Sequence, residues 1–239
     1  MNLPGRAITL KIDGRDVSGR EDETILDVAI ENGIEIPTLC YMKGLSSEGA
    51  CRLCLVEVKG SAQLAPSCVT CVREGMEITT HSERLTRYRK IVLELLLSER
   101  RHICAICVSN GHCELQALAQ KLGVDHVRFP YINQEYPVDA SHKRFVSNPN
   151  CCVLCTRCVR VCDEIEGAHT LDVVGRGFAS QVTHDFILPW GDSETCTSCG
   201  KCVHVCPTGS LFEKGMSVAE MVKRPEFLPY LSKMRRRER

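Results

Sequence analysis

The sequence has 239 residues and 17 cysteines, and its 30 lysine and arginine side chains balance 30 aspartates and glutamates. A formal net charge of zero argues against a nucleic-acid-binding surface that covers the whole protein. The N-terminus lacks the pattern of a secretory signal, and no run of about 18 apolar residues follows, so we expect a cytoplasmic protein without a membrane span. Because stable disulfides are rare in that compartment, we expect the cysteines to bind metal.

Residues 1–81 are predicted to form a small α+β unit. Thr24, followed three positions later by Asp27, is typical of the start of a helix, and Gly33 is typical of its end. The remaining polar and apolar patterning favours β-structure. Strands are expected at residues 7–12, 53–58 and 76–79.

The rest of the chain divides into a helical region, a connector, a cysteine-rich region and a tail. Residues 82–123 are predicted to be mainly helical, and residues 124–145, with prolines and little periodicity, are expected to connect two domains. Residues 146–212 hold two cysteine quartets around a stretch that could form a short hairpin, and prolines interrupt any long helix in residues 213–239. An apolar stripe is expected to be buried in the helical region: Leu85, Tyr88, Ile91, Val92, Leu95 and Leu96.

The two quartets are the strongest chemical signal. Both have the spacing C-x2-C-x2-C-x3-C. An isolated CxxC pair also fits zinc, but in bacterial two-cluster ferredoxins the fourth cysteine of each such quartet binds the cluster of the other. The proline that normally follows that fourth cysteine is Pro207 in one quartet and is replaced by Asp163 in the other, which affects chain direction more than ligation. The rule predicts one [4Fe–4S] cluster on Cys152, Cys155, Cys158 and Cys206, and a second on Cys162, Cys196, Cys199 and Cys202.

A further group of cysteines, Cys40-x10-Cys51-x2-Cys54-x13-Cys68, lies in the N-terminal unit. Plant-type [2Fe–2S] ferredoxins have only four residues between their first two ligands, so that pattern is not met. The longer gap, PTLC at Cys40 and the proline before Cys68 resemble the N-terminal ferredoxin-like domain of the complex I large iron–sulfur subunit and of multi-cluster hydrogenases. The resemblance implies a β-grasp domain with one [2Fe–2S] cluster on these four cysteines, with Cys71 as the alternative to Cys68.

The third group, Cys104-x2-Cys107-x5-Cys113, has three thiols and no fourth. In the same families a histidine four residues before the first cysteine completes a [4Fe–4S] cluster, but Arg100 occupies that position here. His102, two residues before Cys104, is the nearest candidate for the fourth ligand. His112, or a cluster with a different or missing ligand, remains the alternative.

Two cysteines, Cys71 and Cys151, have no place in these groups. Cys151 is adjacent to Cys152 and could compete for the same cluster, but the quartet spacing works only from Cys152. We expect Cys71 to be a buried bystander if Cys68 is the ligand, and the sequence assigns no role to Cys151.

The order of the groups, with the strings CVRVCDEIEGAH and CTSCGKCVHVCPTGS, resembles the iron–sulfur diaphorase subunits of NAD-reducing [NiFe]-hydrogenases almost end to end. The resemblance implies one [2Fe–2S] and three [4Fe–4S] clusters. It also implies a flavin-containing NAD(H)-oxidising diaphorase subunit and the small and large hydrogenase subunits as partners. The chain itself would carry electrons and have no active site, since Gly175-x-Gly177 lacks the third glycine of a dinucleotide fingerprint.

Two other functions remain open. Similar modules occur in NAD-dependent formate dehydrogenases and [FeFe]-hydrogenases, so the chain could be the equivalent relay of such a complex. It could also be a free multi-cluster ferredoxin-like carrier, although a carrier needs only one small redox domain and this sequence predicts more.

Overall fold

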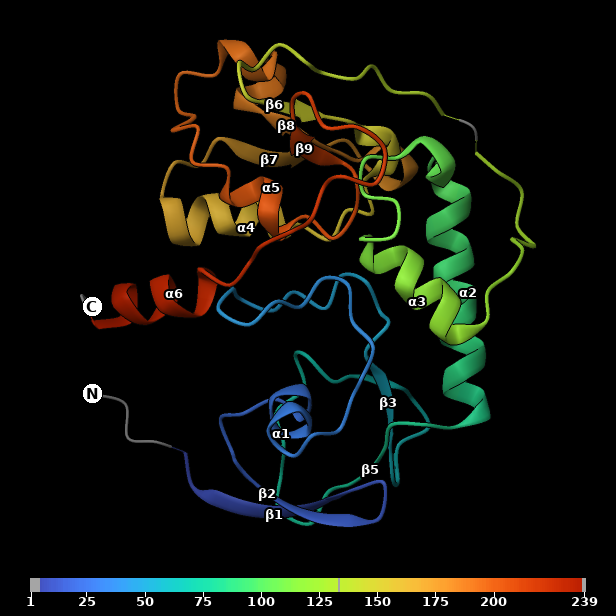
Figure 1. Ribbon diagram of the computed structural model, residues 1–239. Helices are drawn as coiled ribbons and strands as arrows, with labels where there is room; N and C mark the ends of the chain where they lie inside the picture. The colour runs from blue at the N-terminus through green and yellow to red at the C-terminus, as the bar shows by residue number, and fades with distance from the viewer. Residues whose placement is uncertain (1–4, 133, 238–239) are drawn as a thin grey trace. The chain divides into compact units, whose positions relative to one another are not determined.

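The structure, a computed structural model, describes residues 5–132 and 134–237 (Figure 1). The chain forms two compact units, one made of Met1–Tyr41 and Ser47–Val92 and the other of Met42–Ser46 and Leu93–Arg239. No helix in the described residues is long and apolar enough to cross a bilayer.

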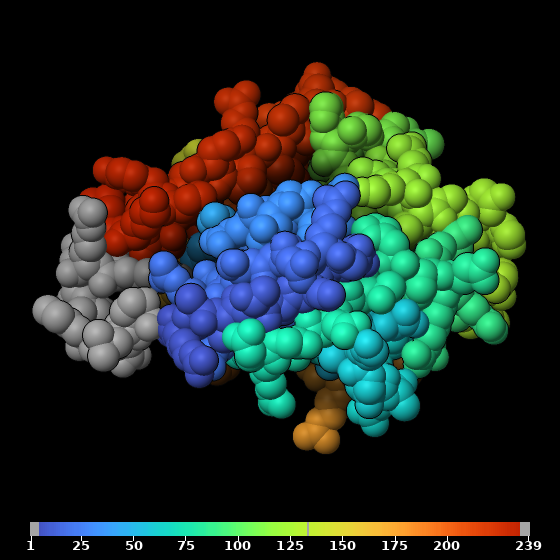
Figure 2. Space-filling model, turned by 90° about the horizontal axis from the view of Figure 1, so that it is seen from below, coloured from blue at the N-terminus to red at the C-terminus, as the bar shows by residue number. Residues whose placement is uncertain are grey.

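The first unit contains a five-stranded sheet in the order β2-β1-β5-β3-β4. β1 pairs with β2 and β3 with β5 in antiparallel fashion, while β1 and β5 are parallel. The inward residues of β1 are buried and the outward ones lie at the surface, in blue in Figure 2. The three predicted strands are confirmed, whereas β2 and the two-residue β4 were not among the predicted strands. The strands are β1 (Ala7–Ile12), β2 (Arg15–Arg20), β3 (Leu55–Val58), β4 (Ala65–Pro66) and β5 (Glu77–Thr79).

Helix α1 (Ile25–Glu31) packs its apolar face into the core of this unit. The Thr24 hydroxyl accepts a hydrogen bond from the Asp27 amide at 3.2 Å, and the Asp27 carboxylate accepts one from the Thr24 amide at 3.3 Å. This reciprocal capping satisfies two backbone donors at the helix start, as the sequence predicted.

Helix α2 (Glu83–Glu99) confirms the helical region but corrects its predicted stripe. Leu85 is buried, whereas Tyr88 and Leu95 are each more than two-fifths exposed. Arg89 lies on the buried face instead, because its guanidinium donates to three backbone carbonyls. The apolar pattern could not reveal this, since a buried arginine depends on partners elsewhere in the fold.

The second unit is built from short elements around the cysteine quartets. Its sheets are two hairpin-sized pairs, β6 with β9 and β7 with β8, and the second pair confirms the hairpin expected between the quartets. Helix α3 ends at Gly123, whose φ of 64° is the left-handed conformation that glycine favours. The elements are α3 (Glu114–Leu122), β6 (Phe145–Ser147), α4 (Arg157–Arg160), a π-helical turn (Val161–Glu166), β7 (Leu171–Val174), β8 (Gln181–His184), α5 (Lys201–Val205), β9 (Leu211–Glu213) and α6 (Leu228–Arg237).

Candidate iron–sulfur sites

The structure brings together the four cysteines predicted for the [2Fe–2S] cluster. Cys40, Cys54 and Cys68 are almost fully buried and Cys51 is half-buried. The sulfurs of Cys54 and Cys68 lie within hydrogen-bonding distance at 3.4 Å, and the Cys51 amide donates to the Cys40 sulfur at 3.5 Å. Cys71 is exposed, so the prediction that it is buried is wrong; its backbone forms an isolated bridge with Thr24.

Hydrogen bonding among these sulfurs divides them into donors and acceptors. Hydrogen bonds from Cys51 and Cys68 lower the pKa of Cys40 to about 2, and one from Cys68 lowers the pKa of Cys54 to about 6. The same hydrogen bonds raise the pKa of Cys51 and of Cys68. Four sulfur atoms gathered at close range are the ligand set of an iron–sulfur cluster, whose binding would release the thiol protons.

The third predicted group lies around a cavity of about 210 Å³ in the second unit. Cys104 is in a 3₁₀ turn after α2, and Cys113 is the N-cap of α3. Gly209 closes another side, where an added Cβ would lie 2.4 Å from the Cys107 sulfur. His102, Cys104, Cys107 and Cys113 all line this cavity.

His102 has the environment of a metal ligand. Burial lowers the pKa of the imidazole to about 4, so it is neutral at physiological pH. The ring donates a hydrogen bond to the Leu96 carbonyl, while Nε2 is buried without a partner. Because Nε2 is unpaired, the donor must be Nδ1, which is how a backbone carbonyl orients metal-binding histidines. The orphaned nitrogen therefore fits a cluster in this cavity.

Cys151 lines the same cavity, although its spacing assigned it to none of the predicted groups. A hydrogen bond from its thiol lowers the pKa of Cys107 to about 6, and the Asn148 amide nitrogen lies 3.7 Å from the Cys151 sulfur. Cys151 ends a 3₁₀ turn and lines this cavity, whereas the extended Cys152 lines another one. Cys151 and Cys152 therefore face different cavities.

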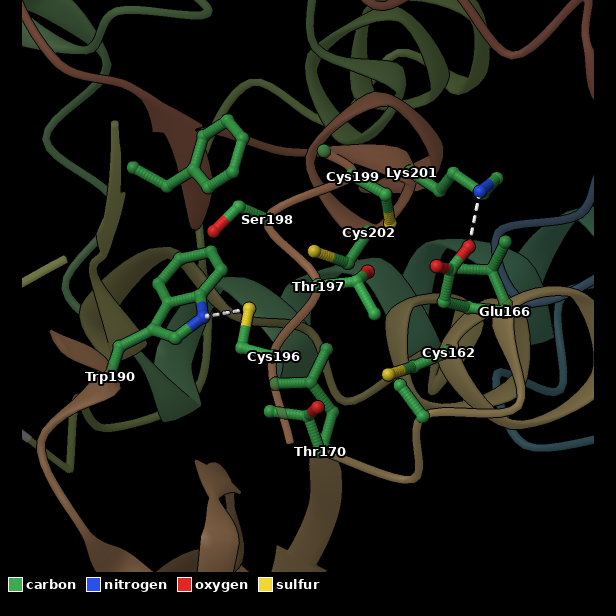
Figure 3. A pocket seen from close by; sticks show the side chains of 15 residues that line it. Cys162, Glu166, Thr170, Trp190, Cys196, Thr197, Ser198, Cys199, Lys201 and Cys202 are labelled. Carbon is green, nitrogen blue, oxygen red and sulfur yellow. Dashed lines mark hydrogen bonds and ion pairs between the residues drawn. The ribbon is translucent and has the colours of Figure 1, made fainter. Parts of the chain in front are cut away.

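The crossed arrangement predicted for the quartets matches two separate cavities. One is lined by Cys152, Cys155, Cys158 and Cys206, and the other by Cys162, Cys196, Cys199 and Cys202 (Figure 3). Within the described residues, no three His, Cys, Asp or Glu side chains converge as they would on a single metal ion.

Both quartets repeat the same backbone path. Positive φ angles occur at Leu154 and Thr156 in the first, and at Ser198 and Gly200, the equivalent positions, in the second. These left-handed turns curl the chain so that consecutive cysteines face one cavity. The Leu154 amide donates to the Cys152 sulfur at 3.4 Å.

Burial and nearby cations shape the Cys152 cavity. Burial raises the pKa of Cys152 to about 11 and that of Cys155 to about 12, so these thiols are neutral at physiological pH until a metal displaces their protons. The buried Arg157 pairs with Glu114 at 2.6 Å. The Lys223 ammonium donates to the backbone carbonyls of Val203 in α5 and Leu211 in β9.

The Cys162 cavity is the more open of the two. Cys199 is exposed, and Cys162 and Cys196 are half-buried. On the Cys196 side the indole of Trp190 donates to the sulfur at 3.3 Å, and on the other side Glu166 pairs with Lys201 (Figure 3).

Three family models match the chain. A 2Fe-2S iron-sulfur cluster binding domain matches residues 5–83, and an NADH-ubiquinone oxidoreductase-G iron-sulfur binding region matches residues 89–128. The ferredoxin-like domain of NADH-quinone oxidoreductase subunit 3 matches residues 146–212. These matches confirm a [2Fe–2S] domain followed by [4Fe–4S] regions in a mixed α and β chain.

Some of the proteins that this chain resembles are hydrogenase subunits. NADP-reducing hydrogenase subunit HndD of Solidesulfovibrio fructosivorans is 41% identical over 214 residues, which are 86% of this chain and 36% of that protein. NAD-reducing hydrogenase HoxS subunit gamma of Cupriavidus necator is 31% identical over 222 residues, 92% of this chain and 93% of that protein. A crystal structure of NAD+-reducing [NiFe]-hydrogenase in the H2-reduced state has a chain with a TM-score of 0.83 and 33% identity, covering 88% of both chains. This chain spans about a third of HndD.

Proposed function

Because the chain belongs to the family of the gamma subunit of NAD-reducing hydrogenase, we propose that it is the electron relay of such a complex. This membership confirms the resemblance drawn from the cysteine spacing. Electrons would pass between a flavin-containing subunit that oxidises NAD(H) and the hydrogenase small and large subunits, in the cytoplasm. The equivalent relay of a formate dehydrogenase or [FeFe]-hydrogenase complex is the alternative.

One observation carries the proposal. In the second unit each of three cavities is lined by one predicted group of cysteines, and in the first unit the four predicted cysteines lie close together. We propose one [2Fe–2S] and three [4Fe–4S] clusters. Their ligands would be Cys40, Cys51, Cys54 and Cys68 for the first; His102, Cys104, Cys107 and Cys113 for the second; Cys152, Cys155, Cys158 and Cys206 for the third; and Cys162, Cys196, Cys199 and Cys202 for the fourth.

Each of these clusters would be bound by one segment of the chain. Residues 1–81 would hold the [2Fe–2S] cluster, residues 82–123 the histidine-ligated cluster and residues 146–212 the remaining two. Residues 124–145 would connect the last two domains, and residues 213–239 would form a tail.

The clusters would supply the iron that accepts and releases single electrons. The protein residues hold each cluster by thiolate or imidazole, exclude water by burial and set the reduction potential through hydrogen bonds to sulfur. No substrate needs to bind this chain for that role.

Anaerobic purification of the intact complex tests the proposal. The chain should carry about 14 iron atoms and should co-purify with a flavoprotein and hydrogenase subunits. About 10 iron atoms would contradict the claim of three [4Fe–4S] clusters. Co-purification with formate dehydrogenase subunits would refute the hydrogenase complex and leave the relay role intact.

A matched pair of variants tests the fourth ligand of the histidine site. H102A should lose about four iron atoms, because three thiols remain, whereas C151S should keep the full content. Full iron in H102A together with loss in C151S would assign the ligand to Cys151 instead.

A further inference from the structure

Trp190 is the only tryptophan in the sequence, and its side chain touches a proposed cluster ligand. It is 1% exposed, and its Nε1–H donates to the Cys196 sulfur at 3.3 Å (Figure 3). Neither the cysteine spacing nor the proposed function assigns this residue a role.

The indole is fixed in place by packing. Its ring stacks on His184, with centroids 4.5 Å apart and planes 15° apart, and on Phe145 at 5.5 Å and 26°. The Trp190 backbone amide donates to the Asp139 carboxylate at 2.7 Å. The direction of the N–H bond toward Cys196 is therefore set by the fold before any cluster binds.

We propose that Trp190 raises the reduction potential of the cluster held by Cys162, Cys196, Cys199 and Cys202; the inference rests on the proposed function. Reduction adds one negative charge to the cluster and its thiolates. A hydrogen bond to sulfur is stronger when the sulfur carries more negative charge, so the N–H stabilises the reduced state more than the oxidised state.

The opposite side of this cavity does not cancel the effect. The Glu166 carboxylate accepts hydrogen bonds from Lys201 and Thr197, and a carboxylate near a cluster would by itself disfavour reduction. Its ion pair with Lys201 offsets that charge. The Trp190 N–H donates to the Cys196 sulfur on the other side of the cavity.

Redox titration of the full-length chain, followed by electron paramagnetic resonance, tests the proposal with W190F. Phenylalanine keeps an aromatic ring and removes the N–H. We expect the reduction potential of one [4Fe–4S] cluster to fall by up to about 59 mV, which corresponds to a tenfold change in the one-electron equilibrium constant. The potentials of the other clusters should stay unchanged. F145L is the matched control for the packing, because it alters the same ring stack but keeps the indole N–H, and it should shift this potential less than W190F does. An unchanged potential in iron-loaded W190F, or an equal shift in F145L, overturns the inference.

The wild-type chain provides two further readouts. Because Trp190 is the only fluorophore of its kind, loading this site should quench tryptophan fluorescence, and an iron-free chain that cannot be loaded would refute the proposed function itself. Ultraviolet resonance Raman of the loaded wild-type chain should show a hydrogen-bonded indole N–H, whether or not W190F folds. A free N–H in the loaded chain refutes only the role of Trp190.

Discussion

Replacing Arg89 by methionine should destabilise the first unit and loosen its cluster site. Arg89 is 2% exposed, and its guanidinium donates to the carbonyls of Leu53 at 3.1 Å, Leu55 at 2.9 Å and Thr80 at 2.9 Å. Two of these residues flank Cys54, a proposed ligand. Methionine preserves much of the apolar stem but leaves three buried carbonyls without this donor.

The size of the effect follows from opposing contributions. A hydrogen bond from a charged donor contributes about 1.5–3 kcal/mol, so three contribute roughly 5–9 kcal/mol. Burial of the guanidinium costs several kcal/mol, and burial also lowers the pKa of Arg89. We expect a net loss of about 2–4 kcal/mol in the free energy of unfolding.

Urea denaturation of the full-length chain, followed by the visible circular dichroism of the [2Fe–2S] cluster, measures this loss. The exposed Arg87 lies on the same helix, and R87M should change stability by less than about 0.5 kcal/mol. Because the Arg89 charge lies near Cys54, R89M should also lower the reduction potential of this cluster. Equal stability losses in the two variants, or a loss below about 1 kcal/mol in R89M, would refute the reasoning.

Three other predictions concern the second unit. G209A should lose the histidine-site cluster, about four iron atoms by iron analysis, because the new Cβ would lie 2.4 Å from the Cys107 sulfur; full iron content would contradict it. E114A should cost about 1–3 kcal/mol in urea denaturation, since it leaves the buried guanidinium of Arg157 unpaired, while the exposed half of the Glu114 side chain reduces the effect. Hydrogen bonds from Arg128 lower the pKa of Glu94 below its ordinary value of 4.5. The ionised Glu94 therefore stabilises the fold fully above pH 4.5, and this stabilisation is lost as the pH falls through the lowered pKa. E94Q should remove this acid-dependent part of the unfolding free energy, and a pH profile like that of the wild type would contradict the prediction.

The sequence predicted the features that depend on spacing along the chain. The capping of α1 by Thr24 and Asp27 is local, and a fixed spacing of cysteines dictates which sulfurs can share a cavity. Cys162 and Cys206 each line the cavity of the other quartet, a placement that the quartet rule predicts because it encodes a long-range pairing.

Features that depend on tertiary contacts could not be predicted. Arg89 lies on the buried face of α2 because its acceptors come from other parts of the first unit. The contact between Trp190 and Cys196 depends on a ring stack with residues from β6 and β8, which no periodicity reveals. The position of Cys151 could not be predicted either. The spacing identifies the cysteines of a quartet, but it does not determine which cavity an additional, neighbouring cysteine lines.

The crossed quartets couple cluster binding to the folding of residues 146–212. Cys206 follows α5 yet lines the cavity of the first quartet, and Cys162 follows α4 yet lines the cavity of the second. Each cluster would therefore cross-link two segments that are distant in sequence. Helices of four and five residues and strands of three or four are too short to be stable alone, so bound iron would supply much of the stability of this region. The groups that tune the clusters, such as Trp190, would then also be the groups that the clusters hold in place.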